Sequence, residues 1–383
     1  MNPILHKDLT HLRHELHKHP ELSGEEYETQ KRLKEFLRTC KPDHLWEVGG
    51  TGLLACFDSK QEGPHILLRA DMDALPIEEE NDDLPHRSTS PGVSHKCGHD
   101  GHSTMLCGVA RRLVENPIAK GRVYLLFQPA EETGQGAKAV LSDPIFQDQH
   151  FDYAFALHNL PGYPAHSIVL RKGSFTASVK SLSARLDGAT AHAAEPESGA
   201  SPALAISRII RQFEEWQQPD YERKDFQLIT PIQVLMGEEA YGTAAGHGIV
   251  RYTLRTWNSE RLEKTQKKIE GLLPKLAKEY GLEVGWDWLE EFYSNHNEEA
   301  AATAIGDTAQ ALGLQAVWRD YPFKWGEDFG LFTQHFPGAM FGLGIGQEAP
   351  ALHRPDYDFL DDVIPTGVGM FEGLARKWCG EAE

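Results

Sequence analysis

The sequence predicts an α/β fold that is interrupted by a smaller α+β domain, and three observations support this prediction. Runs that are apolar on both faces alternate with helical segments, which is typical of a mostly parallel sheet covered by helices on both sides. Residues 176–292 instead follow the order β-α-β-β-α-β, a compact split unit. The length of 383 residues exceeds the size at which one hydrophobic core stops growing. We therefore expect a discontinuous three-layer domain of residues 1–175 and 293–383, and an inserted ferredoxin-like domain of residues 176–292.

Apolar periodicity places the individual elements. Leucines recur at helical spacing between residues 4 and 19 and predict a first helix that ends at Pro20. Ser23 is expected to cap a second helix over residues 24–40. The other elements expected in the larger domain are strands at 51–57, 65–70, 123–130, 152–160 and 339–344, and helices at 101–115 and from 363 onward. Those expected in the inserted domain are strands at 178–186, 230–236, 248–257 and 283–292, and helices at 201–216 and 259–280.

The composition argues against several classes of partner. The formal net charge is −19 and no block of Lys and Arg stands out, which argues against nucleic-acid binding. No apolar run approaches membrane-spanning length. The five cysteines are odd in number and lack a framework spacing, which indicates a reducing compartment. The first residues are charged and contain no apolar signal core, so we expect a cytoplasmic protein.

Side chains that bind metals gather at predicted turns. Cys97 and His99 flank Gly98, and a thiolate with an imidazole suits zinc or a related divalent ion. Glu131 and Glu132 follow an apolar strand, where ligands collect in open α/β sheets. Because adjacent carboxylates point in different directions, one can bind a metal while the other faces a water molecule.

Further donors follow at other strand ends and in a late loop. His158 ends the next predicted strand, at the same edge of the sheet. His353 lies in a turn-rich loop, a reasonable place for a late ligand. Asp71 and Asp73 follow another strand. They could be metal ligands, carboxylates that hold a ligating imidazole, or simple loop residues; we favour the second role for Asp71 and leave the role of Asp73 open. One thiolate, three imidazoles and one carboxylate suffice for two metal ions and leave Glu131 as a proton-transfer base, the chemistry of metal-assisted hydrolysis.

One histidine cluster carries no such prediction. His14 and His17 share the first predicted helix, and the sequence offers them no evident carboxylate partner. We expect both to be structural or solvent-exposed.

Eight stretches together resemble a known family. They are residues 16–23, 69–76, 95–100, 128–134, 157–159, 191–196, 326–329 and 353–359, and they span nearly the whole chain. In content and order they resemble the amidohydrolase branch of the aminoacylase and carboxypeptidase-G-type metallopeptidases, whose members include hippurate hydrolase, indole-acetyl-amino-acid hydrolases and N-acetyl-diaminopimelate deacetylase.

The resemblance implies a catalytic domain with two divalent ions (Zn, Mn, Co or Ni), an inserted lid or dimerisation domain over residues 176–292, and an N-acyl amino acid as substrate. It implies Glu131 as general base, Asp71 as a carboxylate behind a ligand, and His192 as a group that reaches into the partner subunit's site to stabilise the oxyanion. The metal ligands that it implies are Cys97, His99, Glu132, His158 and His353.

The sequence departs from the family pattern within residues 238–252, where Tyr252 stands in place of a usual glycine. Arg255 remains as a candidate ligand for a substrate carboxylate, and a role as a surface residue of a strand explains it nearly as well. Two other classes stay open: a cysteine hydrolase with Cys97 as nucleophile and His99 as its base, and a non-catalytic binding protein on the same scaffold. The identity of the metal, the acyl group and the amino acid is not determined by these residues.

Overall fold

The computed structural model describes residues 2–382 and divides the chain into two compact units. Unit 1 contains the residues up to Phe175, Asn295–Asp320 and the residues from Glu327 onward. Unit 2 contains Thr176–Ser294 and also Tyr321–Gly326, a short segment that the predicted boundaries assign to the larger domain. This segment joins unit 2 because the amide of Ala177 donates to the carbonyl of Trp325 at 3.1 Å.

An eight-stranded sheet forms the centre of unit 1, in the order β1-β2-β4-β3-β5-β16-β6-β15. The middle four strands, β4, β3, β5 and β16, run parallel to one another, whereas β1, β2 and β6 join through antiparallel pairings. The strands are β1 (His44–Val48), β2 (Gly52–Asp58), β3 (His65–Asp71), β4 (Arg122–Gln128), β5 (Tyr153–Leu160), β6 (Ile168–Leu170), β15 (Ala316–Trp318) and β16 (Gly338–Gly344). Two short strands, β7 (Gly173–Ser174) and β14 (His296–Asn297), pair with each other where the chain leaves and re-enters unit 1.

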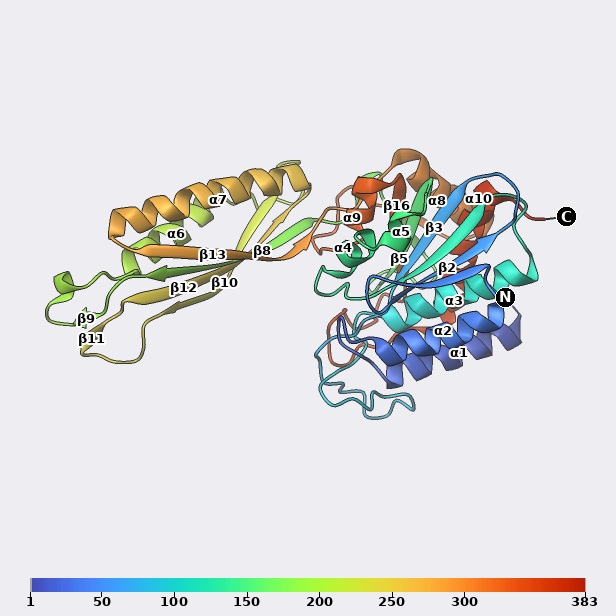
Figure 1. Cartoon of the computed structure of the whole chain (residues 1–383), viewed down its shortest axis with the longest axis horizontal. Helices are drawn as coiled ribbons and strands as arrows, with labels where there is room; N and C mark the ends of the chain where they lie inside the picture. The colour runs from blue at the N-terminus through green and yellow to red at the C-terminus, as the bar shows by residue number, and fades with distance from the viewer. Residues whose placement is uncertain (1, 383) are drawn as a thin grey trace. The chain divides into compact units, whose positions relative to one another are not determined.

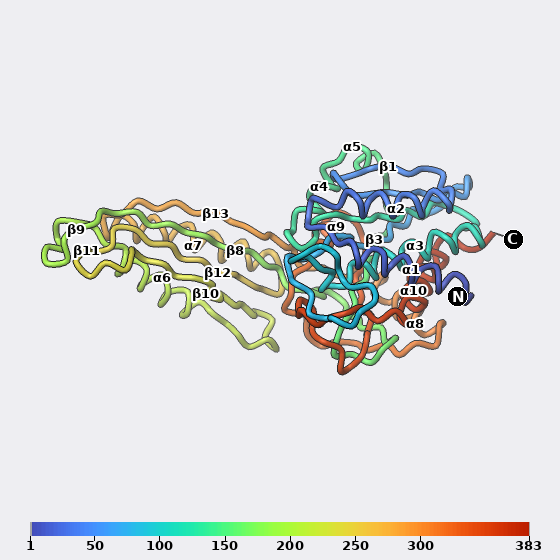
Figure 2. The backbone as a smooth tube through the Cα atoms, turned by 90° about the horizontal axis from the view of Figure 1, so that it is seen from below, coloured from blue at the N-terminus to red at the C-terminus, as the bar shows by residue number. Residues whose placement is uncertain are grey.

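Helices cover both faces of this sheet, as predicted (Figure 1). One face packs on α1 (Pro3–Lys18), α2 (Tyr27–Cys40), α3 (His99–Glu115), α8 (Glu299–Ala311) and α10 (Ile364–Cys379) in a single apolar core. The opposite face carries α4 (Gly136–Leu141), α5 (Pro144–Gln147) and α9 (Gly330–His335), where Phe146 and Phe332 pack edge to face. Figure 2 shows α1, α3 and α10 side by side, so the first and last helices lie in one layer.

The apolar runs of the sequence become strands that are buried on both faces. All seven residues of β4 except Arg122 are buried, and Leu125 and Phe127 point into the core beneath α3. The predicted cap at Ser23 is wrong. The helix begins at Tyr27, and the Ser23 hydroxyl donates instead to the carboxylate of Asp73 at 2.6 Å. A tertiary partner therefore replaces the local cap.

The parallel strands bring the predicted site residues to one edge of the sheet. Strands β3, β4 and β5 end together, and Asp73, Glu131 and His158 lie at or just beyond their carboxyl ends. Helix α3 begins at His99 at the same edge, after Gly98, whose φ of +91° lies in the left-handed region.

Unit 2 has the predicted β-α-β-β-α-β order. Its antiparallel sheet has the strand order β10-β12-β8-β13, and helices α6 and α7 pack on one face of it (Figure 1). The elements are β8 (Ser178–Asp187), α6 (Ala203–Trp216), β10 (Gln227–Met236), β12 (His247–Thr256), α7 (Ser259–Tyr280) and β13 (Glu283–Phe292), with a small ribbon of β9 (Ala191–His192) and β11 (Thr243–Ala244). Among the described residues, no helix combines the length and apolar character needed to cross a bilayer.

Candidate metal centre

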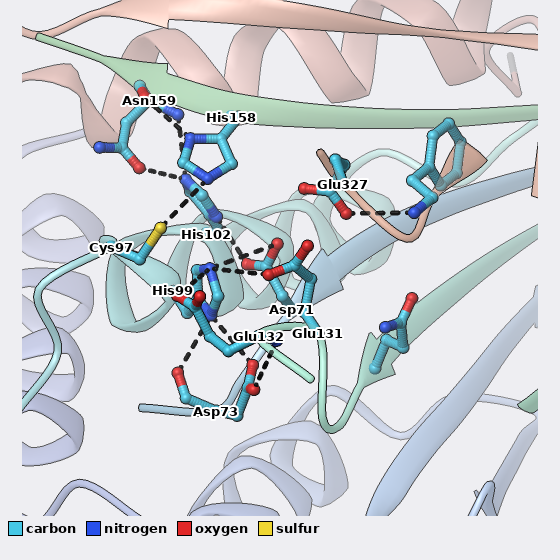
Figure 3. Close-up of polar contacts among 12 residues, drawn as sticks. Asp71, Asp73, Cys97, His99, His102, Glu131, Glu132, His158, Asn159 and Glu327 are labelled. Atoms are coloured by element: carbon cyan, nitrogen blue, oxygen red, sulfur yellow. Dashed lines mark hydrogen bonds and ion pairs between the residues drawn. The ribbon is translucent and has the colours of Figure 1, made fainter. Parts of the chain in front are cut away.

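The five predicted ligands lie close together in unit 1 (Figure 3 shows four of them). Donor atoms of Cys97, His99 and His158 lie within 4.8 Å of one another, and so do those of Cys97, Glu132 and His353. A third such group joins His99 to Glu131 and Glu132. Segments as far apart in the sequence as those of Cys97 and His353 thus converge on one small volume.

Hydrogen bonds orient two of the imidazoles toward this volume. The Nδ1 of His99 donates to both the carboxylate and the backbone carbonyl of Asp73, each at 3.0 Å. The Nδ1 of His158 donates to the carbonyl of Asn159 at 2.8 Å. In each ring the Nε2 lone pair is thereby directed inward, which is how proteins prepare histidine as a metal ligand.

Two buried atoms of the site are left without a protein hydrogen-bond partner. The Nε2 of His99 and the Oε1 of Glu132 are both in this condition, and they lie 3.8 Å apart. Buried polar atoms are rarely unpartnered, because desolvation without a replacement bond is unfavourable. An unpartnered imidazole nitrogen and an unpartnered carboxylate oxygen are both donors that bind divalent cations. The residues present therefore fit the implied metal.

The electrostatics of the site also suit a cation. Burial lowers the pKa of His99, but the carboxylates of Asp71 and Asp73 outweigh it and raise the pKa to about 10. Burial, with Glu327 and Glu132 beside it, raises the pKa of Glu131 well above its usual value. Both shifts report a concentration of negative charge that holds protons, and a bound dication would compensate this charge in their place.

The same field argues against Cys97 as a nucleophile. Burial, reinforced by Glu132 and Glu131, raises the pKa of the Cys97 thiol well above its usual value. A catalytic cysteine needs the opposite, a cationic neighbour that lowers the thiol pKa. The contact between its Sγ and the Nε2 of His158, at 3.4 Å, instead fits two neighbouring metal ligands.

His353 and Glu131 have distinct surroundings. The side chain of His353 is 50 % exposed, and its Nε2 lies 3.5 Å from the Oε1 of Glu132. Glu131 is buried, its Oε2 lies 4.0 Å from the Nε2 of His99, and its Oε1 accepts from the backbone amide of Asp328 at 3.3 Å. Glu131 is thus held at the rim of the ligand cluster.

The two aspartates after β3 take different positions. Asp73 bonds the Nδ1 of His99, and its Oδ2 also accepts from the backbone amide of Glu132 at 3.0 Å. Asp71 lies on the other side, where it accepts from Arg69 at 2.7 Å and binds the Nδ1 of His102 at 2.6 Å. The imidazole that Asp71 holds is therefore that of His102.

His102 was not predicted from the sequence. It follows His99 by three positions on α3, is fully buried, and lies with its ring 4.8 Å from that of His158. The helical spacing of the two histidines is the signal that could have found it. Arg69 was also missed; it is fully buried and binds Asp71 and Asp328, and a long-range pairing of this kind has no local signature.

The other two predicted site residues belong to unit 2. His192 is exposed on β9, where it pairs with Thr243 of β11. Arg255 lies on β12 and donates to the carbonyl of Lys324 at 2.9 Å. Neither shares a unit with the metal-type residues.

Residues 67–377, which include all five predicted ligands, match the family described as Peptidase family M20/M25/M40. The chain belongs to this family. It is 33% identical to the N-acetyl-L-cysteine deacetylase of Bacillus subtilis (strain 168), over 98% of this chain and 90% of that protein. It is 28% identical to the N-acetyldiaminopimelate deacetylase of Exiguobacterium sibiricum, over 96% of this chain and 98% of that protein.

Solved structures agree with this assignment to the M20 family. The YXEP protein of Bacillus subtilis, described as a dinuclear metal binding peptidase of the family, has a TM-score of 0.83 at 27% identity, with 98% of each chain covered. A putative aminohydrolase from methicillin-resistant Staphylococcus aureus has a TM-score of 0.87 at 22% identity, over 98% of this chain and 97% of that one, and shows the shared fold. The predicted family, fold class and enzyme class, a metal-dependent hydrolase of amide bonds, are confirmed.

Proposed function

We propose that this M20 enzyme removes the acyl group from an N-acyl amino acid with the help of two divalent metal ions. The observation that carries the proposal is the convergence of the five donors around the unpartnered Nε2 of His99 and Oε1 of Glu132. The names of the related deacetylases, which refer to N-acetylcysteine and N-acetyldiaminopimelate, support the substrate class.

Cys97 is shared between the two groups of ligands. It stands with His99 and His158 in one group and with Glu132 and His353 in the other, and each group would hold one ion. The bound ions would polarise the substrate carbonyl and lower the pKa of water.

Glu131 is the proposed base. It takes a proton from the attacking water as the new C–O bond forms, and returns that proton to the amine nitrogen as the C–N bond breaks. The products are a carboxylate and a free amino acid. Asp328 supports this role, because its backbone amide donates to one carboxylate oxygen and leaves the other near His99.

Two residues of unit 2 are proposed to complete the site. His192 of the partner subunit would stabilise the oxyanion, and Arg255 would bind the carboxylate of the amino acid. Pre-placed donors of this kind contribute roughly 2.7–4 kcal/mol each to the transition state. Burial lowers the pKa of Arg255, which lies near Glu290, but the guanidinium stays charged at neutral pH.

The proposed dimer would form through unit 2, and the edge strand β10 supports this. In the described part of the chain the outer edge of β10 is paired only at Gln227, which bridges to Gln218. Beyond that bridge, Ile232, Val234, Leu235 and Met236 are 41–60 % exposed. An edge that is both unpaired and apolar is suited to pairing with another copy. A cytoplasmic location is also proposed, and the five buried, unpaired thiols support it.

A chelator and the Glu131→Gln variant test the reaction. EDTA is expected to abolish hydrolysis of N-acetyl, N-benzoyl or longer N-acyl amino acids, and zinc, manganese, cobalt or nickel to restore it. Glu131→Gln should keep its metal content and lose about 10²–10⁴-fold in kcat. Full turnover by this variant, or activity that survives complete removal of metal, would contradict the proposal. Elemental analysis of protein purified without added metal identifies the ion.

A mixing experiment tests the shared site. Glu131→Gln and His192→Ala subunits are each expected to be inactive alone. A dimer that contains one of each would carry one intact site, so mixed samples should regain activity. A fully active monomer by light scattering, or no recovery in mixtures shown to exchange subunits, would contradict the role of His192.

A further inference from the structure

Lys96 makes an unusual set of contacts beside the proposed metal ligands. It precedes Cys97 and is fully buried. Its ammonium donates to the carboxylate of Glu79 at 2.6 Å, to the side-chain carbonyl of Asn81 at 3.1 Å, and to the backbone carbonyl of Tyr357 at 2.8 Å. The three donors of the ammonium are thus all used, and none of them goes to a proposed metal ligand.

The backbone of Lys96 contacts the same late loop. Its carbonyl accepts from the amide of His353 at 2.7 Å. Lys96 therefore holds the loop of residues 353–357 at both ends, through its main chain at His353 and through its side chain at Tyr357. Residues 80–81 make parallel ties, because the amide of Glu80 donates to Pro355 and the amide group of Asn81 donates to Asp356.

The loop needs such support. His353 lies outside regular secondary structure, its side chain is 50 % exposed, and its φ of +64° lies in the left-handed region. A non-glycine residue keeps that backbone conformation only where its surroundings enforce it. The other proposed ligands sit on or beside strands and α3, whereas His353 depends on contacts between loops.

We propose that Lys96 is a positioning residue that ties the loop of His353 to the loop of Cys97 and thereby sets the affinity for the ion that His353 holds. The inference rests on the ligand set of the proposed function. It predicts that loss of the ammonium weakens the binding of one ion selectively, since His353 groups with Cys97 and Glu132 and not with His99 and His158.

The test is a cobalt titration of metal-free protein, followed by the visible absorption of the bound ion and of its thiolate contact. Wild type is expected to bind two equivalents. His353→Ala and Lys96→Met should each keep the first equivalent and bind the second about 10–100-fold more weakly. Lys138→Met removes an exposed lysine of α4 and should titrate as wild type. The double variant Lys96→Met/His353→Ala should bind no more weakly than His353→Ala, because both changes act on the same ligand.

The outcomes separate the two proposals. If the wild type binds fewer than two equivalents of cobalt, or if His353→Ala weakens the binding of neither equivalent, the proposed ligand set is wrong. The role of Lys96 is then wrong as well. If those results hold but Lys96→Met binds both equivalents as wild type, or its effect adds to that of His353→Ala, only the role of Lys96 is overturned. Should Lys96→Met not fold, as judged by circular dichroism, Asn81→Ala removes one acceptor of the same ammonium together with the bond to Asp356, whereas Asn81→Asp removes only the bond to Asp356. Asn81→Ala should bind the second equivalent several-fold more weakly than Asn81→Asp, and equal binding by the two would overturn the inference.

Discussion

Replacement of Asp73 by asparagine is expected to weaken metal binding without removing any proposed ligand. The carboxylate of Asp73 has two oxygens and two tasks. Oδ1 accepts from the Nδ1 of His99 at 3.0 Å, and Oδ2 accepts from the amide of Glu132 at 3.0 Å and from Ser23 at 2.6 Å. An amide has a single acceptor oxygen, so Asp73→Asn must lose an acceptor on one side, as well as the negative charge that raises the basicity of His99.

The magnitude follows from these contacts. A hydrogen bond to a charged group contributes roughly 1.5–3 kcal/mol, and loss of a carboxylate behind a ligating histidine lowers metal affinity about 10–100-fold. The backbone carbonyl of Asp73 also lies 3.0 Å from the Nδ1 of His99 and remains in the variant. We therefore expect the metal affinity of Asp73→Asn to fall by an amount near the lower limit, about 10-fold, which corresponds to about 1.4 kcal/mol.

The assay is competition between metal-free enzyme and a coloured chelator of known affinity. Ser23→Ala provides the matched control, because it removes one hydrogen bond to the same carboxylate and leaves the charge in place; its affinity should stay within about twofold of wild type. Thermal unfolding of both metal-free variants separates loss of fold from loss of binding. Asp73→Asn that binds zinc or cobalt as tightly as Ser23→Ala would refute the idea that the Asp73 carboxylate strengthens His99 as a ligand.

Three further predictions concern stability and the geometry of the site. Gly98→Ala is expected to destabilise the protein by about 1–3 kcal/mol in urea unfolding, because φ is +91° there and an added Cβ would meet the side chain of Asn159 at 2.5 Å; an unchanged midpoint would contradict this reasoning. Burial alone would lower the pKa of His17, but Asp100 and Glu79 raise it to about 9. The protonated imidazole should therefore contribute about 3 kcal/mol to the free energy of unfolding below about pH 6.5, and this contribution should be lost as the pH rises through 9. Between those two pH values the wild type should thus lose more stability than His17→Gln. Parallel plots of unfolding free energy against pH for the two proteins would argue against the ion pairs of His17 with Asp100 and Glu79. Leu125 lies in the middle of β4 and has no exposed surface, so Leu125→Ala should lower the free energy of unfolding by about 2–5 kcal/mol in the same measurement. A change below about 1 kcal/mol would show instead that the surrounding core collapses into the cavity.

The partners of His17 could not be predicted from the sequence. Its place in the first helix was predicted, but its two carboxylate partners lie 62 and 83 positions away along the chain. Nothing in the spacing of the helix indicates either of them. The fully buried Arg69 is a second case, since its partner Asp328 is 259 positions distant. Ser23 is a third case. Its hydroxyl could either cap the nearby helix or bond a distant carboxylate, and it donates to the distant carboxylate of Asp73.

The sequence by itself determined the layered α/β domain, the inserted β-α-β-β-α-β unit and the types of metal-binding side chain, because apolar period and residue chemistry are local properties. It also determined that Cys97, His99, Glu132 and His158 would reach one edge, since parallel strands end together. Only the tertiary structure decided which nitrogen of His99 faces the site and which aspartate holds it. It alone placed Lys96 between the loops, because such pairings depend on side chains that meet across the fold and leave no periodic trace along the chain.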